Sequence, residues 1–190
     1  MDDIASSSDH IILDACCIIN LYASRRMGDI LKSIRKSIAV TAYVRDVEAL
    51  RIYDGPEDNI RSADEKIDLQ PLIDAGLLEV VSLNSEDEEN TFVGFASILG
   101  DDGEAITGAI AIHRGWIVGT DDRKAGAFFS RCNPPVEVIA TLELIKYWAD
   151  VETPSLEDIK VVLRNVRLRA SYEPDRKHIL YGWWQKHFNT

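Results

Sequence analysis

Carboxylate side chains recur where apolar segments of this sequence end. Asp14 follows an apolar run at residues 11–13, and the adjacent pair Asp121 and Asp122 follows a run that ends at Thr120. Adjacent carboxylates repel each other, so such a pair needs either open solvent or a cation. Carboxylate clusters without matching basic residues are how proteins hold Mg²⁺ or Mn²⁺. The chemistry open to such a cluster is metal-assisted hydrolysis.

Two glutamates complete the candidate set. Glu48 shares a predicted helix face with Val44, so we expect its side chain to point toward the sheet. Asp46 lies about 200° away around the same helix and should face solvent. Glu104 belongs to "GDDGEAITGAIAI", where it falls in the first turn of a helix whose other inward positions are Ile and Ala. An acid on an apolar face is informative because a buried carboxylate needs partners.

Each acid also has a purely structural explanation. Asp14 and Asp122 could each cap the helix that follows. Asp121 could belong to a turn, and Glu104 could complement the dipole of its helix. Glu48 could be exposed if its helix is rotated differently. Taken singly, these explanations are preferable, but the four acids on separate elements map to one end of one sheet, which favours a shared site.

The elements that must position these acids alternate between strand and helix. The predicted strands cover residues 11–13, 37–41, 77–83, 115–120 and 135–141. The predicted helices include residues 42–53, 63–75, 91–99, 122–129 and 142–150, together with a long helix that ends at residue 113. Residues 84–90 are predicted to form an acidic turn. This order predicts a three-layer α/β/α fold with a parallel sheet of about five strands and right-handed connections. Ligands of such sheets bind beyond the carboxyl ends of the strands, where these acids fall.

The charge distribution limits how this chain could meet nucleic acid. The net charge of the 190 residues is -11. Residues 1–149 hold 14 Lys and Arg against 26 Asp and Glu, whereas residues 150–190 hold 7 against 6. A general attraction to phosphate is therefore absent, and any contact with nucleic acid would be local or mediated by bound metal.

Cysteine usage and hydropathy indicate the compartment. Cys16 and Cys17 are adjacent in an apolar run, which is typical of buried thiols and not of a disulfide framework or a zinc site. No apolar stretch reaches the ~18 residues that a membrane span needs. The acidic N-terminus lacks the features of a signal peptide. We therefore expect a cytoplasmic protein with no membrane association.

Four segments occur in an order that resembles the PIN-domain nuclease family. They are "IILDACCIIN", the glutamate at position 48, "GDDGEAITGAIA" and "VGTDDRKA". The following "VEVIATLELI" is similar to the fifth strand and helix of the VapC-like subgroup that carries a Gly-Glu-Ala signature. The resemblance covers roughly residues 10–148 and extends weakly into the tail.

The resemblance implies a metal-dependent ribonuclease, and less often a nuclease acting on DNA. The family's four catalytic acids correspond in order to Asp14, Glu48, Glu104 and Asp122 in this sequence. The expected ligands of Mg²⁺ or Mn²⁺ are Asp14, Glu104 and Asp122, with Asp121 as an extra ligand or as an acid behind the ligands. The metal would activate a water for in-line attack on a phosphodiester.

The resemblance also suggests substrate contacts and partners. Thr120 matches the small hydroxyl residue that often precedes the fourth acid, and Asn20 is a candidate for contact with the substrate. Small members of the family are commonly toxins held inactive by an antitoxin protein, so an antitoxin and a homodimer are candidate partners besides RNA. The four histidines form no spaced set and receive no catalytic role.

Two alternative functions remain open at this point. A haloacid-dehalogenase-like phosphohydrolase also places Asp after its first strand, but Cys16 stands where that family has its second Asp. A catalytically inactive module with the same fold is the other alternative, and retention of all four acids argues against it.

The sequence divides into a nuclease-like domain at residues 1–150 and a helical extension at residues 151–190. Amphipathic patterns predict helices at residues 156–168 and 175–186. We expect Trp183 and Trp184 to pack on the chain's own core, with a dimer or partner interface as the alternative.

Overall fold

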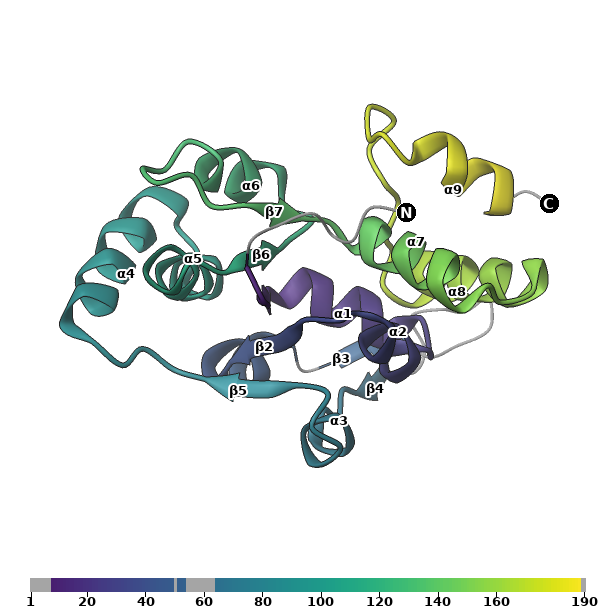
Figure 1. The fold of residues 1–190 in the computed structure, drawn as a ribbon, viewed down its shortest axis with the longest axis horizontal. Helices are drawn as coiled ribbons and strands as arrows, with labels where there is room; N and C mark the ends of the chain where they lie inside the picture. Colours follow the sequence, from purple (N-terminus) through teal and green to yellow (C-terminus); the bar gives the residue numbers. More distant parts are fainter. Residues whose placement is uncertain (1–7, 50, 54–63, 189–190) are drawn as a thin grey trace.

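A five-stranded parallel sheet forms the centre of the computed structural model, which describes residues 8–49, 51–53 and 64–188 (Figure 1). The strands are β1 (His10–Leu13), β2 (Ser37–Thr41), β5 (Glu79–Val81), β6 (Ile117–Gly119) and β7 (Val138–Ile139), in the spatial order β5-β2-β1-β6-β7. Leu13 lies opposite Val40 on one side and Gly119 on the other, so the carboxyl ends of the three central strands are level. The predicted fold class is confirmed.

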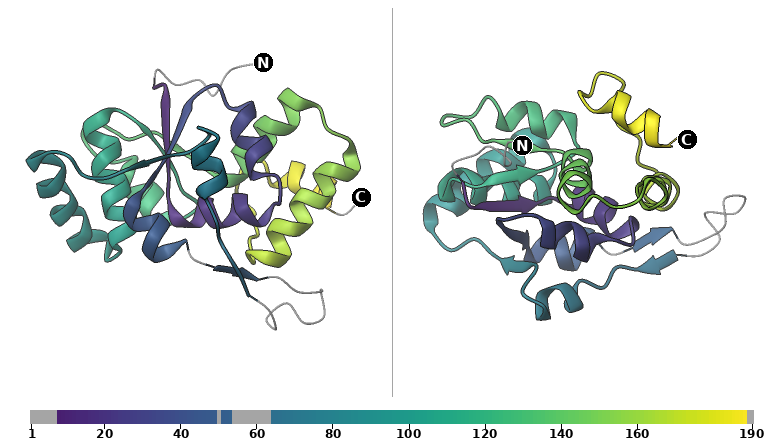
Figure 2. Two further views of the ribbon diagram at one scale, coloured as in Figure 1. Left: turned by 90° about the horizontal axis from the view of Figure 1, so that it is seen from below. Right: turned by 45° about the vertical axis from the view of Figure 1, so that its right-hand side comes forward.

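Helices cover both faces of the sheet (Figure 2). One face carries α1 (Ala15–Ala23), α2 (Met27–Ser33), α3 (Gln70–Asp74), α7 (Thr141–Glu152) and α8 (Leu156–Arg169). The other carries α4 (Glu86–Leu99), α5 (Asp102–Arg114) and α6 (Arg123–Phe129). The alternation of strand side chains explains this division, because Ile11 and Leu13 enter the first core and Ile12 enters the second.

The segment after β2 differs from the prediction. The helix predicted over residues 42–53 ends early in η1 (Val44–Glu48), a short and wide turn of π-helix. The chain then forms β3 (Arg51–Tyr53), which pairs antiparallel with β4 (Asp64–Lys66). The helix predicted over residues 63–75 shrinks to α3, because Pro71 fits only the first turn of a helix. Part of the intervening segment, residues 54–63, lies outside the described residues.

The acidic stretch at residues 84–90 is a helix start and not a turn. Ser85 caps α4 by accepting a hydrogen bond from the Glu88 backbone N–H, and four acids occupy the first turn. Negative charge there is stabilised by the helix dipole. Glu88 is buried, and its carboxylate pairs with Arg114 at 2.7 Å.

The C-terminal region forms two helices, α8 and α9 (Tyr181–Phe188). The second begins six residues later than predicted. Ile159, Val162 and Val166 of α8 and Trp184 of α9 are buried in the same core as α1 and α7. Among the helices that the structure describes, none combines the length and the apolar character needed to cross a membrane.

Candidate active site

Asp14 is fixed at the carboxyl end of β1. Its backbone N–H donates to the carbonyl of Gly119 at 2.9 Å, which locks it to β6. Its Oδ1 accepts from the Ala15 N–H at 2.7 Å and thereby caps α1. Its Oδ2 accepts from the Thr120 hydroxyl at 3.2 Å and from the Cys16 thiol at 3.4 Å. The side chain is 4% exposed, so its position is set by the fold.

Glu48 lies at the end of η1 and reaches the first turn of α5. The backbone of Gly103 lies close enough to its carboxylate to lower the pKa of Glu48. A Cβ added to Gly103 would lie 1.9 Å from Oε2 of Glu48, so only glycine at position 103 leaves room for the carboxylate. The glycine that precedes Glu104 in the sequence is therefore explained by this close approach. Asp46 is exposed, as predicted, and it pairs with Arg45.

Glu104 and Asp122 face each other from two helix starts. Asp101 caps α5 by accepting from the Glu104 N–H at 2.9 Å, which places the Glu104 side chain in the first turn. Asp122 caps α6 through the Ala125 N–H at 2.8 Å. The Asp122 N–H also donates to the Thr120 hydroxyl at 3.1 Å. Thr120 therefore bonds to two of the four acids at once.

Charge interactions link these acids to one another. Burial raises the pKa of Glu48 to about 7, helped by the charges of Asp101 and Asp14. Burial also raises the pKa of Glu104 to about 7, helped by the charges of Asp122 and Asp14. The pKa of Asp14 is raised by burial, with a smaller contribution from Asp101. Like charges disfavour ionisation, and these acids act on one another in this way.

Basic groups do not neutralise this cluster. Within the part of the chain that the structure describes, none of the four acids forms an ion pair with Lys or Arg. Lys124 lowers the pKa of Glu104 slightly, but its ammonium donates to the carbonyl of Leu99. The donor set thus consists of oxygen atoms with uncompensated negative charge, which fits Mg²⁺ or Mn²⁺.

The structure places Asp121 away from this cluster. Its Oδ2 accepts from Asn20 at 2.9 Å and from the Thr141 hydroxyl, and its Oδ1 accepts from the Thr141 N–H at 3.0 Å. The charge of this carboxylate also contributes to raising the pKa of Tyr172, after burial. Both oxygens of Asp121 accept hydrogen bonds from within the fold, so these bonds would have to be exchanged for Asp121 to hold a metal ion.

Two residues predicted to contact substrate are also buried. Asn20 is 5% exposed and directs its amide to Asp121, and Thr120 is 3% exposed and bonds Asp14 and Asp122. Both side chains are bonded to acids of this region, an arrangement that the types and spacing of the residues did not reveal.

A second group of potential ligands lies beside the acids. The ligand atoms of Cys16, Cys17 and Asp121 are within 4.8 Å of one another. Burial raises the pKa of the Cys17 thiol, which stays protonated and hydrogen-bonds to Asp121 at 3.6 Å. This thiol-containing group does not suit Mg²⁺ or Mn²⁺, which prefer oxygen. Among the described residues, no three of the four acids bring oxygen atoms within 4.8 Å of one another.

Comparison with models of known protein families and with curated proteins finds no match to this chain. The resemblance to PIN-domain nucleases rests on the ordered sequence motifs.

The raised pKa values predict how stability depends on pH without metal. Glu48 and Glu104 have a pKa near 7 in the folded protein against 4.5 ordinarily. The folded state then binds more protons than the unfolded state between these values, so the free energy of unfolding should fall as pH rises from about 4.5 to about 7. Melting temperatures in EDTA across this range check the sign. Glu48→Gln and Glu104→Gln should each reduce the loss of stability between these pH values. Equal pH profiles of the melting temperature for wild type and both variants would contradict the assignment of this loss to the two glutamates.

Proposed function

We propose that this protein is a metal-dependent nuclease that hydrolyses phosphodiester bonds in RNA. The observation that supports the proposal best is the convergence of Asp14, Glu48, Glu104 and Asp122 beyond the carboxyl ends of the central strands, with no basic partner among the described residues. A structural role for each acid does not explain why the cluster tolerates its own repulsion. A catalytic site does, since perturbed carboxylates gather where chemistry needs them.

The residues of the chain have separable roles in this proposal. Asp14, Glu104 and Asp122 would hold Mg²⁺ or Mn²⁺, which when bound supplies a Lewis acid and an activated water. Thr120 keeps Asp14 and Asp122 in a fixed relation. Glu48 is held against Gly103 at the edge of the cluster and, with a pKa of about 7, can exchange a proton near neutral pH.

The substrate and the cellular role follow from the family resemblance. PIN-domain nucleases act mainly on RNA and less often on DNA, so we take RNA as the substrate. The resemblance also favours a cytoplasmic toxin whose antitoxin partner covers the acidic site. The family resemblance is also consistent with a homodimer.

Cleavage is expected to require divalent metal. Labelled RNA and DNA of the same sequence are incubated with the protein in Mn²⁺, in Mg²⁺ and in EDTA. We expect RNA to be cut in either metal and to stay intact in EDTA, because the described acid cluster offers no alternative nucleophile. Full activity in the chelator would contradict the metal-dependent mechanism, and preferential cleavage of DNA would contradict the substrate.

A further inference from the structure

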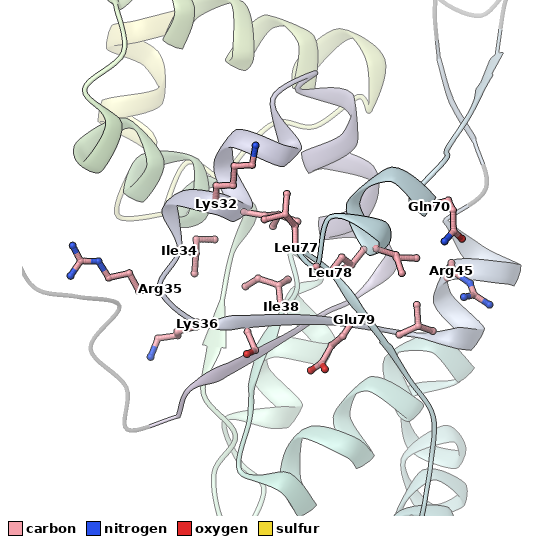
Figure 3. Close-up of a pocket in the computed structure, with 15 residues that line it drawn as sticks. Lys32, Ile34, Arg35, Lys36, Ile38, Arg45, Gln70, Leu77, Leu78 and Glu79 are labelled. Atoms are coloured by element: carbon pink, nitrogen blue, oxygen red, sulfur yellow. The ribbon is translucent and has the colours of Figure 1, made fainter.

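A surface groove of about 840 Å³ lies between α2 and α3, over strands β2 and β5 (Figure 3). Among the described residues that line it, four are basic, namely Lys32, Arg35, Lys36 and Arg45, and one is acidic, namely Glu79. Figure 3 shows Arg35 and Lys36 at one end of the groove and Arg45 at the other. This local excess of positive charge stands out in a chain with a net charge of -11.

The basic side chains of the groove differ in how they are engaged. Lys36 donates to the carbonyl of Ser8 at 2.5 Å, and Arg45 pairs with its neighbour Asp46 at 2.6 Å. Lys32 and Arg35 are exposed, and neither forms an ion pair with any residue that the structure describes. These two cations are therefore available to an anionic ligand.

The apolar lining of the groove offers limited surface to other occupants. Leu31, Ile34, Ile38 and Leu78 are only 2–6% exposed, and three further apolar residues are half-buried, namely Ile73, Leu77 and Val80, so an amphipathic helix would bury only part of an apolar face there. The described lining residues include no aromatic ring on which a nucleic-acid base could stack. What the groove offers is charge, which suits the phosphates of a flexible polyanion and carries no sequence preference.

One end of the groove lies at the element that carries an acid of the candidate active site. Arg45, at one end, belongs to η1, the same short element that carries Glu48. The acid site itself repels phosphate until a metal is bound, so attraction for a polynucleotide has to come from cations elsewhere on the chain. A basic groove that ends at the element carrying Glu48 meets this requirement.

We infer that this groove binds the sugar-phosphate backbone of single-stranded RNA and guides it to the acid site. The inference rests on the proposed nuclease function for its substrate, but it concerns binding and can be tested without cleavage.

The test compares wild type with a double variant that carries both Lys32→Gln and Arg35→Gln. A fluorescent twelve-nucleotide oligouridine is titrated in EDTA, where no cleavage is expected, at several salt concentrations between 50 and 200 mM. Each phosphate contact on a single strand contributes about 0.7 to the slope of log K against log salt, so the variant should lose about 1.4 from the slope. Its affinity at the lowest salt should fall by about tenfold. The matched control is a second double variant that carries Arg176→Gln and Lys177→Gln. It loses two exposed charges from the C-terminal region and should bind the oligouridine as wild type does.

Several results would overturn the inference. An unchanged slope and affinity in the groove variant would do so, as would an equal loss in the control. Equal binding of a polyglutamate peptide of the same charge would show that the groove does not select nucleic acid. Cleavage by the same preparations in Mn²⁺ separates the two proposals. If wild type binds RNA but never cuts it, the proposed nuclease function is refuted and the groove inference stands. If wild type cuts RNA and the groove variant binds RNA with normal affinity, the groove inference is refuted and the proposed nuclease function stands.

Discussion

Asp14→Asn is expected to reduce cleavage by about a hundredfold or more, because it removes a ligand charge at the centre of the acid cluster. Asn caps a helix as well as Asp does, so the hydrogen bond from the Ala15 N–H should persist. The substitution also relieves repulsion from Glu48 and Glu104, whose pKa values the Asp14 charge raises. The metal-free stability should stay unchanged or rise by about 1 kcal/mol.

The same reasoning applies to Asp122→Asn, where the cap to the Ala125 N–H is kept and the charge beside Glu104 is lost. Initial rates of RNA cleavage and melting temperatures in EDTA measure the two effects separately. If either Asn variant melts well below wild type, or if it cuts RNA at the wild-type rate, then that carboxylate acts only as a helix cap.

Gly103→Ala is expected to reduce the rate of RNA cleavage by roughly a hundredfold, a loss similar to that of Asp14→Asn, while the protein still folds. The added methyl group would lie 1.9 Å from Oε2 of Glu48, so the carboxylate would have to leave its place against α5. Ala at a helical position is favoured over Gly by up to about 1 kcal/mol, which offsets part of the strain. The expected signature is a loss of activity with nearly unchanged melting temperature.

Gly108→Ala is the matched control on the same helix. Its added methyl group would lie 2.2 Å from Cε1 of Phe129, in the core between α5 and α6 and not against Glu48. Overpacking of this kind costs about 1–3 kcal/mol of stability, so the variant should melt earlier but cut RNA normally while folded. Normal activity in Gly103→Ala would show that the position of Glu48 against Gly103 is not needed for catalysis.

Local patterns were sufficient to predict the parts of the fold that position the site. The strand Ser37–Thr41 has the predicted bounds, and the acids Asp14 and Asp122 follow their strands as expected. The competing explanations for these two residues proved compatible, because one carboxylate oxygen caps a helix while the residue also joins the acid cluster.

Features that depend on distant contacts could not be predicted. Strands β3 and β4 pair antiparallel, with Ile52 of β3 buried in the first core, and this pairing has no signature within either segment. The adjacent acids Asp121 and Asp122 point to opposite sides, since successive side chains of an extended segment alternate. Asp121 is bound by Thr141, twenty residues later in the chain, so only the folded structure separates a supporting acid from a candidate ligand.

The most direct test of the central claim, that these acids form a divalent-cation site, is the melting temperature of the protein at pH 7.5 with and without Mn²⁺. Wild type should gain about 2.7 kcal/mol of stability when free Mn²⁺ reaches one hundred times its Kd, because the ion binds the folded state alone. Asp14→Asn and Asp122→Asn should gain much less under the same conditions. A wild-type melting temperature that Mn²⁺ leaves unchanged, or an equal gain in all three proteins, would contradict the assignment of these carboxylates to a metal site.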